Sequence, residues 1–203
     1  MGPEDAACWL ADVAAVSDLL SAGVARQTIR RRLSGKRWQQ PSPRVVCRTT
    51  GTLTAHQWML VALAHGGPGA MISHATAGAF WGFDATTGAA TGPVHVTVPH
   101  GRRRPSTVEI QVHQSVRPCE PRLVEDLLVT PPARTAVDMA LCLTSATSVA
   151  AHLGRVMQRG RVSLEQLADE LDQARAAGRD CLERRWPTWR SVRGRPPRHD
   201  CCT

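Results

Sequence analysis

Residues 16–38 read VSDLLSAGVARQTIRRRLSGKRW, and this segment constrains the fold more than any other. Ala25, Ile29 and Leu33 have the spacing of the buried face of a helix. Gly23 interrupts the helical pattern just before them, and glycine accepts the positive φ that a tight turn requires. We therefore expect one helix before Gly23 and a second helix over 25–33, with Val24 packed between them.

The residues before Gly23 predict helical structure, and the residues after the second helix predict a β-hairpin. Residues 9–22 place apolar side chains at three- and four-residue spacing, which predicts a helix, and Ser17-Asp18 predicts a short second helix over 18–22. Residues 36–53 change to a strand–turn–strand pattern, with the turn at Pro41-Ser42-Pro43 and a strand over 44–48. Two helices followed by a β-hairpin are typical of a winged helix-turn-helix.

The side chains expected on the outer face of the second helix and along the hairpin are mostly basic. Residues 26–48 hold eight basic groups and no acidic group. Arginine pairs with guanine and glutamine with adenine through two hydrogen bonds, whereas cations beside a groove contact phosphates. The predicted contacts to duplex DNA are Arg26, Gln27, Thr28, Arg30, Arg31, Lys36, Arg37 and Arg44. The alternative is a solvated basic helix face that binds nothing.

The whole chain is basic as well, with a net charge of +8 and a pI of about 10.0. Such a surface attracts polyanions, of which nucleic acids are the most common. Lys36 is the sole lysine, so the abundance of arginine also reflects a GC-rich coding sequence. Charge therefore agrees with DNA binding without establishing it.

Alternating helix and strand patterns after residue 53 predict an α+β fold. Helices are expected over 55–65, 74–81, 132–143, 146–159 and 163–177, and strands over 94–98, 108–113 and 127–130. In the second of these strands Val108, Ile110 and Val112 are expected on one face. The predicted organisation is a winged helix-turn-helix domain over 9–53, a small mixed sheet-and-helix domain over 54–177, and a basic tail over 178–203. The tail has no apolar period, and we expect it to be disordered or aberrant.

No catalytic or metal-binding residues are predicted. The eight histidines lack metal-ligand spacing, although His95 and His113 lie on neighbouring expected strands and could meet across a sheet. Ser73 lacks the surroundings of a hydrolase nucleophile and instead precedes a helix that starts at His74. Arg134 and Asp138, four residues apart, predict a structural ion pair and not a catalytic pair, although Arg134 could equally anchor the start of its helix to the sheet. No cofactor is expected.

The seven cysteines and the apolar stretches bear on the compartment. The cysteines have irregular spacing without a C-x-x-C pair, which favours reduced thiols over a disulfide framework or a zinc site. The start of the chain lacks the basic and apolar regions of a signal peptide, and no apolar stretch is long enough to cross a bilayer. A cytoplasmic, soluble protein with no membrane partner is expected.

Several segments together resemble the AbiEi-like antitoxins of type IV toxin–antitoxin systems, which act in abortive infection as a phage defence. The matching segments are AGVARQTIRRRLSGKRWQQPSP (22–43), ISHATAGAFWGF (72–83), PVHVTVPHGRRRP (93–105), VHQS (112–115) and LLVTPPARTAVDMA (127–140). The resemblance spans roughly residues 12–177. It implies a transcriptional autorepressor that binds its own promoter through an N-terminal winged helix. It also implies antagonism of a nucleotidyltransferase-like toxin without a stable complex.

The sequence departs from that family in two places. Arg44-Val45-Val46 stands where the family often has Gly-Val-Tyr at the second wing strand, which predicts a less tightly turned wing. Longer relatives continue into a domain similar to very-short-patch-repair endonucleases, whereas only 25 residues follow Gly178 here. Two alternatives to an antitoxin stay open. They are a remnant of a restriction-like nuclease, disfavoured because Lys36 has no acidic neighbour, and a protein-interaction module.

Overall fold

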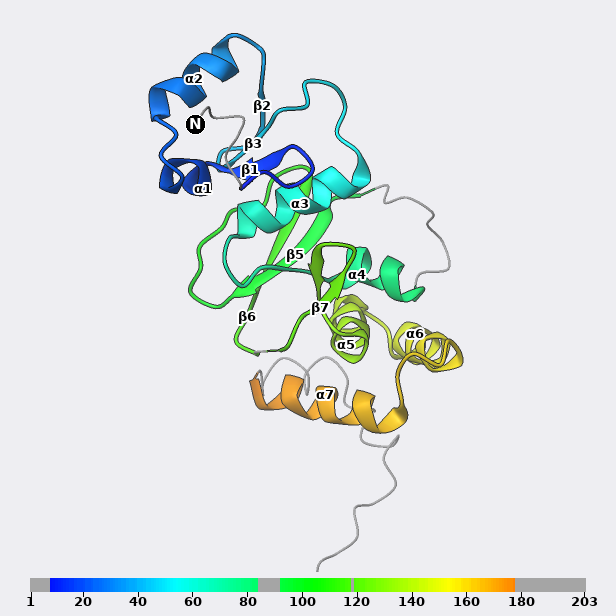
Figure 1. Cartoon of the computed structure of the whole chain (residues 1–203). Helices are drawn as coiled ribbons and strands as arrows, with labels where there is room; N and C mark the ends of the chain where they lie inside the picture. The colour runs from blue at the N-terminus through cyan, green and yellow to red at the C-terminus, as the bar shows by residue number, and fades with distance from the viewer. Residues whose placement is uncertain (1–7, 84–91, 118, 178–203) are drawn as a thin grey trace, which may run out of the picture.

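The computed structural model describes residues 8–83, 92–117 and 119–177, which form a mixed α+β fold as predicted (Figure 1). The expected tail over 178–203 lies outside the described residues. In chain order the elements are β1 (Val13–Ala15), α1 (Val16–Ser21), α2 (Arg26–Ser34), β2 (Gln39–Ser42), β3 (Val45–Cys47), α3 (Ala55–Gly66), β4 (Met71–Ile72), α4 (His74–Trp81), β5 (Val94–Pro99), β6 (Ile110–Ser115), β7 (Arg122–Val124), β8 (Leu127–Val129), α5 (Pro132–Cys142), α6 (Ala146–Gln158) and α7 (Leu164–Ala177).

The helix predicted over 9–22 is wrong, because its middle forms strand β1. Val13 pairs with Cys47 and Ala15 with Val45, so that β1 is an edge of an antiparallel sheet in the order β1-β3-β2. A tight turn with positive φ at Ala11 and Asp12 precedes the strand. All residues of β1 are buried, and tertiary burial of both faces overrode the helical spacing. Only the last turns became helix, as α1.

The small sheet lies between two groups of apolar side chains. Val13, Val45 and Cys47 belong to the cluster that includes α3 and the larger sheet. Ala14 and Val46 point the other way and pack with Leu19, Ile29 and Trp38 of the helical pair and the hairpin. Because successive side chains of a strand point to opposite faces, the small sheet packs against the N-terminal helices on one face and against the rest of the molecule on the other.

The larger sheet has the strand order β6-β5-β4-β8-β7. Strands β5 and β6 are parallel, with Val96 opposite Val112 and Thr97 opposite His113. The alternate residues Val94, Val96 and Val98 pack in the cluster that contains α3. Because side chains alternate along a strand, His95 and Thr97 lie on the opposite face of the sheet, where His74 at the start of α4 stacks on His113.

Helices α5, α6 and α7 form a third apolar cluster beyond this second face. Val137, Val156 and Leu167 are its buried centre, and Phe83 after α4 joins it. The N-terminal helices and α7 lie at opposite ends of the molecule (Figure 1). Among the described residues, no helix is long and apolar enough to cross a membrane.

The other helices agree with prediction to within one or two residues, but three details of the strands differ. Strand β2 continues through Ser42, so the hairpin turn lies at Pro43-Arg44 and not at 41–43. The strand predicted over 108–113 is shifted to 110–115, because the backbone N–H of Thr107 bonds to the Ile110 carbonyl in a turn that leaves Val108 88% exposed. Strands β4 and β7 were not predicted. They have only two and three residues, which is too short to show a period.

Candidate functional site

The turn between α1 and α2 has the conformation that the sequence predicts. Gly23 adopts a φ of +86°, and its N–H bonds to the Leu20 carbonyl. The next N–H, that of Val24, bonds to the Leu19 carbonyl, and the Val24 side chain packs against the cluster between the helices. A positive φ at this position would strain any residue that has a Cβ atom, and glycine avoids that strain.

Helix α2 separates an apolar face from a basic one. Ile29 is 5% exposed and packs with Leu19 and Trp38, while Leu33 is partly buried beside them. Ala25 was predicted to be buried and is exposed, because it precedes the first turn of α2 as its cap. The outward residues are Arg26, Gln27, Arg30 and Arg31, all exposed as predicted, with Thr28 partly buried.

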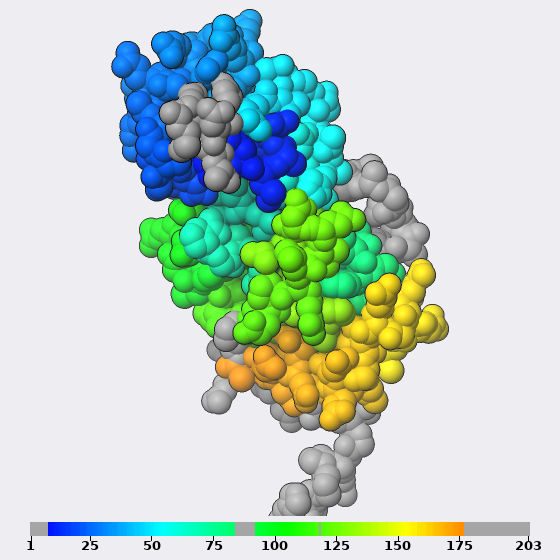
Figure 2. Space-filling model, in the orientation of Figure 1, coloured from blue at the N-terminus to red at the C-terminus, as the bar shows by residue number. Residues whose placement is uncertain are grey.

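The turn after α2 and the β2–β3 hairpin add further exposed cations. Lys36, Arg37 and Arg44 are exposed, with Arg44 in the turn between β2 and β3. Within the described part of the chain, no ion pair involves these three or the arginines at 26, 30 and 31. Six cations that lack acidic partners there create a positive potential that attracts a polyanion. These residues lie at one end of the molecule (Figure 2).

Arg48 is different from the other basic residues of this segment. Its Nη2 lies 2.8 Å from Asp12 Oδ1, and its guanidinium lies 4.7 Å from the centre of the Trp9 ring. Arg48 therefore ties β3 to the turn before β1. Arg48 is one of the eight basic groups of residues 26–48, and the sequence could not identify its partner, because Asp12 is 36 residues away along the chain.

A second basic segment, which the sequence did not connect with the first, lies near the hairpin. Burial, together with repulsion from Arg44 and Arg102, lowers the pKa of the Arg104 guanidinium. Both Ser42 of β2 and Pro105, which follows this segment, bond to His65, so the Arg102–Arg104 segment lies near the hairpin turn. The basic surface therefore extends beyond residues 26–44.

Buried His65 explains why the two turns meet. Its Nδ1 lies 2.6 Å from the Ser42 hydroxyl of β2, and its Nε2 lies 2.9 Å from the Pro105 carbonyl. His65 is 1% exposed at the end of α3. One imidazole thus links the hairpin to the loop that carries the second basic segment. No local sequence pattern could have revealed this bridge.

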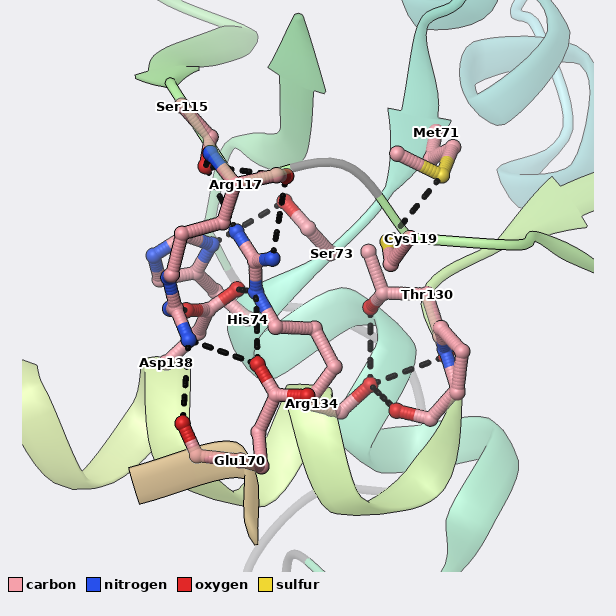
Figure 3. Close-up of polar contacts among 12 residues, drawn as sticks. Met71, Ser73, His74, Ser115, Arg117, Cys119, Thr130, Arg134, Asp138 and Glu170 are labelled. Atoms are coloured by element: carbon pink, nitrogen blue, oxygen red, sulfur yellow. Dashed lines mark hydrogen bonds and ion pairs between the residues drawn. The ribbon is translucent and has the colours of Figure 1, made fainter. Parts of the chain in front are cut away.

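A separate polar cluster lies at the face of the larger sheet opposite Val94, Val96 and Val98. Figure 3 shows part of this cluster. The predicted pair is confirmed, since Arg134 Nε lies 2.7 Å from Asp138 Oδ2. Arg117 bonds to the other Asp138 oxygen at 2.5 Å and to Glu170 of α7 at 2.6 Å. Arg134 also donates to the Ser115 hydroxyl at the end of β6. These four charges compensate one another, although burial raises the pKa of Glu170.

Three histidines meet beside this network. His95 Nδ1 lies 2.9 Å from His113 Nε2, which confirms that these residues meet across the sheet. The His74 ring stacks on His113, with ring centres 3.6 Å apart, and its Nδ1 lies 3.0 Å from the Ser73 hydroxyl. One nitrogen from each ring lies within 4.8 Å of the other two. The sequence predicted no metal site here because His74 is distant from both strands.

Burial keeps the three imidazoles neutral. Burial, with the charges of His113 and His95, lowers the pKa of His74 from 6.5 to about 3. Burial and His95 lower the pKa of His113 to about 4, and burial lowers that of His95. Near pH 7 the cluster therefore presents uncharged rings, which have lone pairs available for hydrogen bonds or for a metal ion.

No protein-family model matches the sequence, and none of the curated proteins compared with it is significantly similar.

Proposed function

We propose that this chain is a DNA-binding transcriptional regulator in which residues 13–47 act as a winged helix-turn-helix. Helix α2 enters the major groove, and the β2–β3 hairpin is the wing along the adjacent backbone. The proposal rests on one observation: α2 and the hairpin expose cations that have no acidic partners among the described residues. A structural surface normally intersperses charges of both signs.

Two features of α2 support this orientation. Its N-cap, Ala25, provides no side-chain hydrogen bond, so the first backbone N–H groups of the helix can meet a phosphate. Gln27 and Arg30 are exposed on the same helix and have the hydrogen-bonding groups that read adenine and guanine. The Arg102–Arg104 turn supplies additional phosphate contacts next to the wing.

Fluorescence anisotropy with labelled duplexes from the chain's own promoter tests the proposal. The log–log dependence of affinity on salt should have a slope of roughly −4 to −7, as about five to eight phosphate contacts would give. The double variant Arg26→Ala/Arg30→Ala should abolish specific binding. Arg155→Ala/Arg159→Ala removes the same charge from exposed positions of and just after α6, and it should bind like the unmodified chain. Equal losses in both double variants would contradict the assignment.

We further propose, from the resemblance to AbiEi-like proteins, that the chain is an autorepressing type IV antitoxin. The residues after β3 would then antagonise a nucleotidyltransferase-like toxin without forming a stable complex and without catalysis. Co-expression with such a toxin from a neighbouring gene tests this role. The Arg26→Ala/Arg30→Ala variant should lose repression of its promoter and still restore growth. Failure of the unmodified chain to restore growth would contradict the antitoxin role and leave DNA binding unaffected.

A further inference from the structure

We propose that His74, His95 and His113 form a binding site for one divalent transition-metal ion of the zinc class. The site lies between the first turn of α4 and the β5–β6 pair, away from the basic end of the molecule. It is independent of the proposed DNA binding. The donor atoms are three imidazole nitrogens, and water would complete the coordination.

The spacing of the nitrogens fits such an ion. Nitrogens bound at about 2.0 Å to one tetrahedral zinc ion lie roughly 3.3 Å apart. The His95–His113 separation is 2.9 Å, and all three donor nitrogens lie within 4.8 Å of one another. The three rings lie nearly parallel, with interplanar angles between 13° and 28°, so His74 and His113 must tilt out of their stack before their lone pairs converge on one ion. His95 and His113 are partly exposed, which gives a solvated ion access.

The pairing of β5 with β6 fixes the positions of His95 and His113 relative to each other. Thr97 pairs with His113 in the parallel β5–β6 ladder, and His95 lies two residues before Thr97 on the same face. The third ring comes from His74, whose backbone adopts a φ of +50° at the start of α4. That conformation is uncommon for a residue with a side chain, and it accompanies the stacking of His74 on His113.

The hydroxyl groups of Ser73 and Thr97 could form hydrogen bonds with the ligands of a metal ion. His74 Nδ1 lies 3.0 Å from Ser73 Oγ, and a proton donated from Nδ1 to this hydroxyl would leave the Nε2 lone pair for the ion. The Thr97 hydroxyl is buried on the histidine face and has no hydrogen-bond partner among the described residues. A buried hydroxyl without a partner is costly, and a water molecule bound to the ion would satisfy it.

Besides the reorientation of the rings, the binding step requires a change of tautomer. One proton lies between His95 Nδ1 and His113 Nε2, on whichever nitrogen is the donor. When the ion takes both lone pairs, that proton moves through water to the other nitrogen of the same ring. Each imidazole stays neutral, and nothing is oxidised or reduced. Arg117 and Arg134 disfavour positive charge near His74, and Asp138 and Glu170, which pair with them, reduce this repulsion.

Calorimetry with zinc chloride on the chelator-treated, full-length chain tests the site. The unmodified chain should bind zinc at micromolar concentration, and His113→Gln and His95→Gln should each lose one equivalent. His100→Gln, an exposed residue just after β5, is the matched control and should lose none. Full zinc uptake by both folded cluster variants, or no uptake by the unmodified chain, would overturn the proposal.

Two measurements on the unmodified chain identify the residues that bind the metal. They distinguish histidine from cysteine ligands and do not depend on whether a variant folds. Bound cobalt(II) should show weak visible bands without the intense thiolate charge-transfer band that cysteine ligands produce. In histidine ring NMR spectra, one equivalent of zinc should shift three ring systems together. A shift of fewer than three rings, or a thiolate band from the first equivalent, would refute a site built from these histidines.

Discussion

Arg134 and Asp138 lie one turn apart on α5 and form a buried ion pair, with Arg134 Nε 2.7 Å from Asp138 Oδ2. Asp138 also accepts from Arg117 through its other oxygen, so one carboxylate holds two guanidinium groups. This contact connects α5 to the segment after β6, and Glu170 extends it to α7. The network therefore joins the sheet to the C-terminal helices.

Asp138→Ala should be strongly destabilising. Removal of the carboxylate leaves two buried guanidinium groups with Glu170 as their acidic partner, and breaking a buried ion pair typically costs about 3–5 kcal/mol. The free energy of unfolding in urea measures the effect. Glu165→Ala changes an exposed acid on α7 and should stay within about 0.5 kcal/mol of the unmodified chain. Similar losses in the two variants would show that the network contributes little.

Arg30→Ala and Lys36→Ala should weaken DNA binding in different ways. Arg30 is exposed on α2 and is expected to read a base, so its loss should cost about 1–3 kcal/mol and relax base preference. Lys36 follows α2 and is expected to contact phosphate, so its loss should weaken all sequences alike. Anisotropy titrations against specific and shuffled duplexes separate the two. A uniform loss in both variants would contradict this division of roles.

Gly23→Ala should destabilise the fold although the site has room for a methyl group. A Cβ at Gly23 would meet no atom within 4 Å, but the φ of +86° costs an alanine about 1–2 kcal/mol. Gly154→Ala is the control, since Gly154 lies inside α6 with equal room and without a positive φ. That change should stabilise by about 0.5–1 kcal/mol. Thermal unfolding of the two variants should therefore shift in opposite directions.

In the presence of a chelator, the histidine cluster should make the fold sensitive to acid. Its neighbours His113, His95, Arg134 and Arg117 add to burial in lowering the pKa of His74 to about 3, against 6.5 for a free ring. The unfolded chain therefore binds more protons below pH 6.5, and stability must fall as the pH falls from about 6.5 toward 3.

Urea unfolding at a series of pH values measures this dependence. His113→Gln removes one of the titrating groups and should give a shallower decline over that range. His100→Gln leaves the cluster intact and should follow the unmodified chain. A stability that does not change between pH 6.5 and pH 4 would contradict the neutral state of the cluster.

Local patterns in the sequence were sufficient for the parts of the fold that depend on neighbouring residues. The turn at Gly23, the buried side of α2 at Ile29 and the exposed basic side of that helix all follow from the spacing of side chains along the chain. The same holds for the ion pair between Arg134 and Asp138, which are one helical turn apart. Contacts of this kind require only the regular geometry of one element.

Contacts between distant segments could not be inferred in this way. Residues 13–15 have helical spacing, yet pairing with β3 and burial on both faces made them a strand. His65 joins the hairpin to the second basic turn, and His74 reaches His95 and His113, because tertiary packing places α3 and α4 against the sheet. The proposed metal site depends on three segments whose proximity is a consequence of strand register and helix packing.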